Sequence, residues 1–356
     1  MSRRNPLPQR RTPRQLQLES LEDRRVMATS ASIVGGVLEV RGTNAAETIT
    51  ISESRLQIGR LQVLIRSATG QTTLNRTFQA SRVDRIYVAA YGADDVVTNN
   101  TNLPSDLYGG RGNNTVTGGS GNDRIHGWYD RDTLKGRGGN DELFGYGNDD
   151  VISGGEGHDW IEGGDGRDSL SGDNGDDMIW GQGHGDELFG GIGSDFLDGG
   201  TGDDYLSGSV GNDTMFGGLG DDELHGGVGS DWMWGDGEFE SSRDGHDTMF
   251  GDDGNDRMYG MGGNDELDGG FDHDTLEGGS GNDTLKGNDG EDVLHGGAGS
   301  DSFDGGLNQT DAIIDVMYFD ALDWNVDGLP GLVRSIGAAG VTEGRYEGSW
   351  IYEGHD

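Results

Sequence analysis

The sequence predicts an all-β protein in which short parallel strands stack into a solenoid of roughly ten coils. Three observations carry this expectation: a nine-residue unit repeats in tandem over residues 109–304, every unit holds one large apolar residue, and almost every unit holds an aspartate. The chain has 356 residues, 70 glycines, no cysteine and a formal net charge of −40. Because only 31% of the residues are hydrophobic, we expect folding to need help from outside the sequence.

The repeat has the form GxxGxDxUx, where U is large and apolar. It runs from Gly109 to Trp234, is interrupted by the insertion GEFESSR at residues 237–243, and resumes to Asp304, giving 21 copies. Position 6 is aspartate in 20 of the 21 copies, Asn114 being the exception, and position 8 is apolar in all of them. Because the pattern is so regular, we predict the fold from the repeat and not from the composition of individual segments.

The spacing of the apolar residues decides the kind of fold. A period of nine does not match the 3.6-residue turn of an α-helix, so no helix face can collect the apolar residues. We expect instead a six-residue turn followed by a three-residue strand whose middle residue faces inward. Two units would form one 18-residue coil with two sheets back to back. At position 4 the glycine is replaced in four units, by Asp130, Asn148, His184 and Asp272. If this position needs a positive φ, asparagine and aspartate tolerate it best, and His184 is the least favourable of the four replacements.

The charge of the repeats predicts a bound cation. Residues 109–304 contain 46 acidic and nine basic residues, a balance of −37. Turn carbonyls and carboxylates without nitrogen or sulfur ligands suit a hard ion, and Ca²⁺ tolerates such flexible oxygen sets better than Mg²⁺. Roughly one Ca²⁺ per nonapeptide turn would add about +40 and nearly neutralise the segment. The candidate ligands are the position-6 aspartates: Asp123, Asp132, Asp141, Asp150, Asp159, Asp168, Asp177, Asp186, Asp195, Asp204, Asp213, Asp222, Asp231, Asp247, Asp256, Asp265, Asp274, Asp283, Asp292 and Asp301.

The tandem GGxGxDxUx units, such as GGSGNDTLK at Gly278–Lys286, resemble the RTX (repeats-in-toxin) calcium-binding nonapeptide family. The resemblance implies a calcium-loaded parallel β-roll, with ions held between successive turns by position-6 aspartates and turn carbonyls. It also implies secretion and folding in a calcium-rich exterior. Position 5 is often asparagine or aspartate, and these residues are expected to be either solvated turn residues or auxiliary ligands.

The flanks suggest three further segments. Residues 1–27 form a basic leader, either a disordered tail or a targeting segment; LESLEDRRVMA (residues 18–28) resembles an element near the N-terminus of secreted repeat proteins of planctomycete-type bacteria. Residues 28–108 are rich in β-branched residues and predict a small β region merging into the roll. Residues 305–356 are expected to cap the roll or to act as an export signal.

Several functions are disfavoured. The acidic surface argues against nucleic acid, and no transmembrane segment is expected. The histidines fall mostly at outward positions, and neither an HExxH nor a G-x-S-x-G motif occurs, so we expect no enzyme activity. Outward tryptophans could be scattered surface aromatics or could stack on sugar rings: Trp128, Trp160, Trp180, Trp232 and Trp234.

We therefore expect a secreted or cell-surface calcium-binding protein with a structural or interaction role. The alternative is an accessory or catalytic protein that acts on extracellular polysaccharide through the roll surface. Calcium is the expected partner in both cases, and polysaccharide or cell-surface components are candidate partners.

Overall fold

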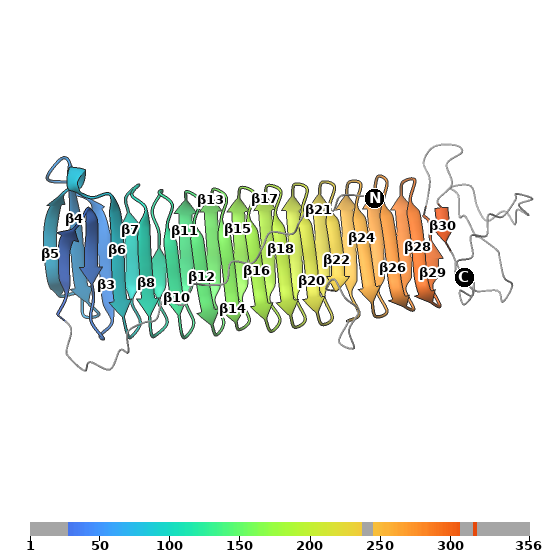
Figure 1. Cartoon of the computed structure of the whole chain (residues 1–356), viewed down its shortest axis with the longest axis horizontal. Helices are drawn as coiled ribbons and strands as arrows, with labels where there is room; N and C mark the ends of the chain where they lie inside the picture. Colours follow the sequence, from blue (N-terminus) through green and yellow to red (C-terminus); the bar gives the residue numbers. More distant parts are fainter. Residues whose placement is uncertain (1–27, 237–244, 307–315, 319–356) are drawn as a thin grey trace, which may run out of the picture.

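The computed structural model describes residues 28–236, 245–306 and 316–318. Over these residues the chain forms one long solenoid built from two 15-stranded sheets that run its whole length (Figure 1). The predicted all-β parallel solenoid with 18-residue coils is confirmed, but it has about 12 turns rather than ten. The additional turns come from residues before Gly109, whose strands join the same two sheets.

Sheet A contains the strands that begin the chain and then every second strand of the repeats: β1 (Ser30–Val34), β2 (Val37–Arg41), β6 (Arg85–Tyr91), β8 (Ser105–Gly110), β10 (Arg124–Trp128), β12 (Glu142–Gly147), β14 (Trp160–Asp165), β16 (Met178–Gly183), β18 (Phe196–Thr201), β20 (Thr214–Leu219), β22 (Trp232–Asp236), β24 (Arg257–Gly262), β26 (Thr275–Gly281), β28 (Val293–Gly299) and β30 (Val316–Tyr318).

Sheet B contains the remaining strands, in the order β29 (Ser302–Asp304), β27 (Thr284–Asp289), β25 (Glu266–Phe271), β23 (Thr248–Asp253), β21 (Glu223–Val228), β19 (Tyr205–Val210), β17 (Glu187–Ile192), β15 (Ser169–Asn174), β13 (Val151–Glu156), β11 (Thr133–Gly138), β9 (Thr115–Thr117), β7 (Val96–Asn100), β3 (Glu47–Glu53), β4 (Arg60–Ser67) and β5 (Thr72–Gln79). A short 3₁₀ helix, Ala80–Arg82, connects β5 to β6.

The strands of the repeats are longer than the predicted three residues. A typical strand such as β12 has six residues, running from position 7 of one unit to position 3 of the next, so the turn shrinks to positions 4–6. Its burial alternates, with Leu143 at position 8 and Gly145 at position 1 both facing inward. Position 1 therefore lies on the inner side of the strand, next to the turn that carries the aspartate.

The core consists of two parallel columns of position-8 side chains. Neighbouring strands pair in register, so Leu143 lies beside Ile161 in sheet A and Leu188 lies beside Leu206 in sheet B. These side chains are completely buried, and together they form one continuous hydrophobic cluster from Ala31 to Leu294. Each strand of the repeats contributes one large side chain, so the core is long and thin.

The N-terminal end of the solenoid is built differently. β1 pairs antiparallel with β2, and β3, β4 and β5 form an antiparallel meander at the end of sheet B. The side chains of β5 are mostly exposed and polar. A polar edge strand of this kind discourages further strands from adding to the open sheet.

The turns need backbone conformations that L-residues rarely adopt. The four non-glycine residues at position 4 have φ values of 72° (Asp130), 70° (Asn148), 75° (His184) and 74° (Asp272), as the glycine pattern predicts. Position 2 adopts positive φ as well, including at Trp128 (93°). The glycine pattern does not predict this second requirement, because position 2 is often not glycine.

The insertion does not disturb the stacking on either side of it. Leu224 in β21 pairs with Met249 in β23, so the coil that contains the insertion closes in the same register as its neighbours. The leader at residues 1–27, the insertion at 237–243 and nearly all of the tail at 305–356 lie outside the described residues. Among the described residues, no helix has the length and hydrophobicity needed to cross a membrane.

Candidate metal centre

The position-6 aspartates form two rows along the two edges of the solenoid, one at the turns that precede the strands of sheet A and one at the turns that precede sheet B. All of them are buried, with at most 6% of any residue exposed. The sequence-predicted residues are therefore brought together row by row, each one coil away from the next.

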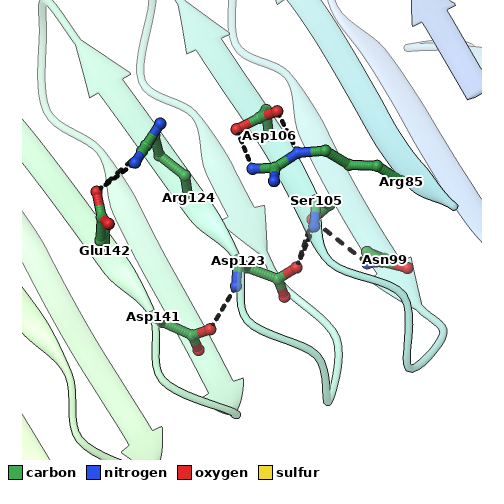
Figure 2. Close-up of polar contacts among 8 residues, drawn as sticks. All are labelled: Arg85, Asn99, Ser105, Asp106, Asp123, Arg124, Asp141 and Glu142. Atoms are coloured by element: carbon green, nitrogen blue, oxygen red, sulfur yellow. Dashed lines mark hydrogen bonds and ion pairs between the residues drawn. The ribbon is translucent and has the colours of Figure 1, made fainter. Parts of the chain in front are cut away.

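A hydrogen-bond ladder holds each row. The backbone N–H of Asp123 donates to Oδ1 of Asp141 at 2.7 Å, and Asp123 Oδ1 in turn accepts from the backbone N–H and the hydroxyl of Ser105, both at 2.7 Å (Figure 2). The same bond recurs along both rows at 2.6–2.9 Å, for example from Asp186 N–H to Asp204 Oδ1 (2.6 Å) and from Asp247 N–H to Asp265 Oδ1 (2.9 Å). One carboxylate oxygen of each aspartate is thus used to fix the turn of the preceding coil.

The other carboxylate oxygen, Oδ2, has a different environment. In all the position-6 aspartates from Asp132 to Asp256, within the described residues, Oδ2 is buried and accepts no hydrogen bond. A Cβ placed on Gly199, at position 1, would lie 2.5 Å from Asp204 Oδ2 and 2.6 Å from the carbonyl oxygen of Gly217 in the next coil. Only glycine leaves this space open, and a carboxylate oxygen and a carbonyl oxygen from two coils point into it.

Burial raises the pKa of these carboxyl groups. The ordinary aspartate pKa of 3.8 rises to about 8 for Asp141 and to about 9 for Asp222, with desolvation as the largest cause and neighbouring aspartates as a smaller one. Asp159 is raised less, to about 6. A row of carboxylates in this environment needs either protons or a positive ion to compensate for lost hydration.

The donor set fits calcium. The oxygens are one carboxylate and backbone carbonyls from adjacent coils, with no nitrogen or sulfur among them, which suits a hard cation that accepts variable geometry. Nowhere in the described part of the chain do three histidine, aspartate or glutamate side chains gather into a conventional metal cluster. The candidate site is instead a small repeated unit that pairs a carboxylate oxygen with a backbone carbonyl oxygen of the next coil.

The ladders continue beyond the predicted residues at their N-terminal ends. Asp95 N–H donates to Asn114 Oδ1 at 3.0 Å, Glu47 N–H donates to Asp95 Oδ1 at 2.7 Å, and burial raises the pKa of Asp95 to about 8. The sequence contains the D-x-U-x pattern at Asp95–Thr98. However, Asp95 and Asn114 are 19 residues apart rather than 18, so a repeat search with a fixed spacing does not include Asp95. At Asp123, unlike the later aspartates, Oδ2 accepts the Gly119 N–H at 2.6 Å.

Position 5 forms a second ladder on the outside of the turns. Asn140 N–H donates to Asn122 Oδ1 at 3.1 Å, and His158 N–H donates to Asn140 Oδ1 at 3.2 Å. The pattern continues with Asp176 N–H donating to His158 Nδ1 at 2.8 Å. These residues are exposed in the turns, and in addition they accept backbone hydrogen bonds from the next coil, a role that the sequence did not predict.

The expected exposure of the histidines is wrong for His126. This residue is 6% exposed, its ring lies between Tyr108 and Phe144 at centroid distances of 4.6 and 5.0 Å, and burial lowers its pKa to about 3. The outward tryptophans are not scattered either. All five belong to strands of sheet A, where Trp160 and Trp180 have ring centroids 4.2 Å apart and Trp234 stacks on Phe216 at 4.6 Å. The expected exposure is wrong for Trp180, which is only 3% exposed.

Comparison with known families covers the same residues as the repeats seen in the structure. A family model described as the RTX calcium-binding nonapeptide repeat (4 copies) matches residues 106–128, 129–161, 153–183, 180–215, 207–238, 242–276 and 277–309. Together these matches cover more than half of the chain. A search of curated proteins found no match.

Proposed function

Because this chain belongs to the RTX calcium-binding nonapeptide-repeat family, and is a calcium-binding β-roll protein, we propose that it folds on calcium outside the cell and acts there as a structural or interaction protein. The observation that supports this best is the double row of buried carboxylates whose Oδ2 atoms face carbonyl oxygens of the next coil. Without a cation, the −37 charge of residues 109–304 would oppose the compact state.

We propose that the position-6 aspartates are the side-chain ligands, each sharing an ion with carbonyls of the next coil. This gives roughly one Ca²⁺ per nonapeptide turn. Glycine at position 1 is then a functional residue as well, because it leaves the space into which both kinds of oxygen point. The ladder from backbone N–H to Oδ1 orients each carboxylate so that Oδ2 is available to the ion.

The proposed calcium dependence supports an extracellular location. Extracellular calcium modules have dissociation constants of roughly 10⁻⁴–10⁻³ M, so the repeats would remain unfolded at intracellular calcium levels. We also propose that the chain has no enzyme activity of its own, since its sequence contains neither an HExxH nor a G-x-S-x-G motif.

Far-UV circular dichroism during a calcium titration tests the proposal. We expect little strand signal in calcium-free buffer, a cooperative gain at millimolar Ca²⁺, and no comparable gain with the same concentration of Mg²⁺, which requires tighter octahedral geometry. An equally strong strand signal with and without calcium would contradict the proposal.

A second candidate function, binding of extracellular polysaccharide, is favoured by one observation. The outer side of sheet A carries most of the aromatic side chains of the roll, in a row that includes Phe196, Phe216 and Trp234. A glycan array probed with and without calcium tests it. Calcium-dependent binding to a defined glycan would favour the carbohydrate role, and no binding would leave the structural role.

A further inference from the structure

The aromatic row on sheet A contains a one-coil break. At position 9 of successive coils, Tyr108, His126 and Phe144 stack at centroid distances of 4.6 and 5.0 Å. The next residue in this column is Glu162, which pairs in register with Phe144. In the column beside it, Trp128 stacks on Tyr146 at 4.9 Å, and the residue paired with Tyr146 is Gly164. Both columns therefore lose their rings at the same coil.

A cavity of about 150 Å³ occupies this break. Its lining comes from three neighbouring strands, with the two rings that end the stacks on β12, the backbone at residues 163–164 on β14 and polar side chains around them: Phe144, Tyr146, Glu162, Gly163, Gly164, Asp165 and Gln182.

Glu162 is the unusual member of this cavity, because it is a carboxylate that is only 6% exposed. One carboxylate oxygen accepts the Trp160 Nε1–H at 2.8 Å and the other accepts the Gln182 side-chain amide at 3.1 Å. Both donors are neutral, and each carboxylate oxygen keeps a further acceptor site. A buried carboxylate held only by neutral groups lacks the countercharge that usually accompanies burial.

We propose that this cavity binds a small organic cation, an ammonium or quaternary ammonium group, between Glu162 and the aromatic wall formed by Phe144 and Tyr146. The carboxylate supplies the countercharge and the ring faces attract the cation through their quadrupoles. Asp165, which is exposed at the cavity, adds a second negative charge. A calcium ion fits poorly here, because it needs six to eight oxygen ligands and one wall is aromatic.

This site is independent of the metal rows. It lies on the outer face of sheet A, whereas the position-6 aspartates lie in the turns at the sheet edges. The cavity exists only in the folded roll, so this inference rests on the proposed calcium-dependent folding. The two proposals can still be tested separately. Loss of the strand signal tests the folding proposal, and loss of ligand binding by a folded protein tests the cavity.

Isothermal titration calorimetry of the full chain tests the proposal, at constant saturating calcium and with sodium chloride as the ionic-strength control. The probes are tetramethylammonium and glucosamine, which carry the charge, and N-acetylglucosamine and glucose, which do not. We expect one cation site, with neutral sugars binding at least about tenfold more weakly. Comparison of the two cations distinguishes a quaternary ammonium ligand from an amino sugar.

Variants locate the site. Glu162→Gln retains a hydrogen-bond acceptor but removes the charge, and should weaken cation binding at least about tenfold. Tyr146→Leu should weaken it several-fold through the lost ring. The matched control is Glu277→Gln, which changes a carboxylate at the same position 9 of sheet A, in β26, where its neighbour is His295 at 3.8 Å. Circular dichroism confirms that each variant is folded.

The proposal is wrong if no cation binds up to about 100 mM while the strand signal is intact, or if neutral sugars bind as tightly as cations and Glu162→Gln has no effect. If Glu162→Gln does not fold, Tyr146→Leu carries the test, because Tyr146 is only half-buried. Unchanged cation binding in a folded Tyr146→Leu protein would then overturn the proposed site.

Discussion

At the scale of single residues, aspartate and glycine divide one task between them. Asp213 Oδ1 accepts the Asp195 N–H at 2.8 Å and stabilises the turn one coil earlier, while its Oδ2 accepts no hydrogen bond from the described residues. The glycine at position 1 leaves room for Oδ2 and for a carbonyl of the next coil. Removing either residue should damage the cation site, but through different atoms.

The charge and the hydrogen bond of one aspartate can be separated. Asp213→Asn should keep the acceptor for Asp195 N–H but remove one negative oxygen, so the calcium midpoint for folding should rise; Asp213→Ala should raise it further, because it also breaks the ladder. The control is Asp203→Asn, since Asp203 is exposed and its Oδ1 accepts the Asp221 N–H at 3.2 Å. Calcium titration by circular dichroism measures the midpoint. Equal midpoints for Asp213→Asn and the control would contradict the assignment.

The space at position 1 can be tested with a single methyl group. Gly199→Ala should destabilise the calcium-loaded protein by about 1–3 kcal/mol, because its Cβ would lie 2.5 Å from Asp204 Oδ2. Gly183→Ala is the control: its φ is not positive and the nearest atom to its Cβ is 3.7 Å away, so the change should be within about 0.5 kcal/mol. Urea unfolding at saturating calcium compares them. A harmless Gly199→Ala would show that the space is not needed.

At the scale of the element, the strand is longer than its apolar content suggests. Only one large side chain per strand enters the core, as Leu285 does in β27, yet the strand runs for six residues. The additional residues form ladder hydrogen bonds with the coils before and after, so pairing between coils, not burial, extends the strand. The apolar pattern alone predicts a strand of three residues. It does not reveal the additional paired residues, because backbone hydrogen bonding between coils does not depend on side-chain hydrophobicity.

A thin core should be sensitive to cavities. Leu285→Ala should cost about 2–5 kcal/mol, as buried leucine truncations usually do, because Leu285 is completely buried between Leu267 and Phe303. Thr284→Ala, in the same strand but on its outer side, should cost well under 1 kcal/mol. Urea unfolding at fixed calcium gives both values. Similar losses for the two variants would argue against a core made of position-8 residues.

At the scale of the whole molecule, the dominant quantity is the charge of the two aspartate rows. Folding without calcium brings groups such as Asp141 and Asp222 into an interior that raises their pKa to about 8 and about 9. In the unfolded chain, aspartates ionise near their ordinary pKa of 3.8. The folded calcium-free state therefore binds more protons, so its stability falls as the pH rises from about 4 toward 8.

This linkage predicts an acid-induced gain of structure. Calcium-free protein should show more strand signal at pH 5 than at pH 8, because protons then replace the missing ions on the buried carboxylates. At saturating calcium the signal should stay constant between pH 6 and 8, since the carboxylates remain ionised and paired with the metal. Circular dichroism of resin-treated protein across this range measures both. More structure at pH 8 than at pH 5 without calcium would contradict the prediction.

The sequence by itself determined the repeat, and with it much of the architecture. A nine-residue period with one apolar and one acidic position predicts an 18-residue coil. Such coils stack the apolar side chains in two inner columns and the aspartates in two rows. The position-4 turn conformation followed from glycine and its substitutes at Asp130 and Asn148. These features are local or strictly periodic, so they can be predicted from the sequence without knowing which coils are in contact.

Only the tertiary structure decided what depends on contact between coils. It joined residues before Gly109 to the same sheets, placed Asp95 in the row across a 19-residue step, and revealed the backbone bonds to Oδ1. It also gathered the aromatic side chains on sheet A and buried Glu162 at the break in their stack. The residues in these contacts lie about one coil apart along the chain, and they come close together only because the coils stack.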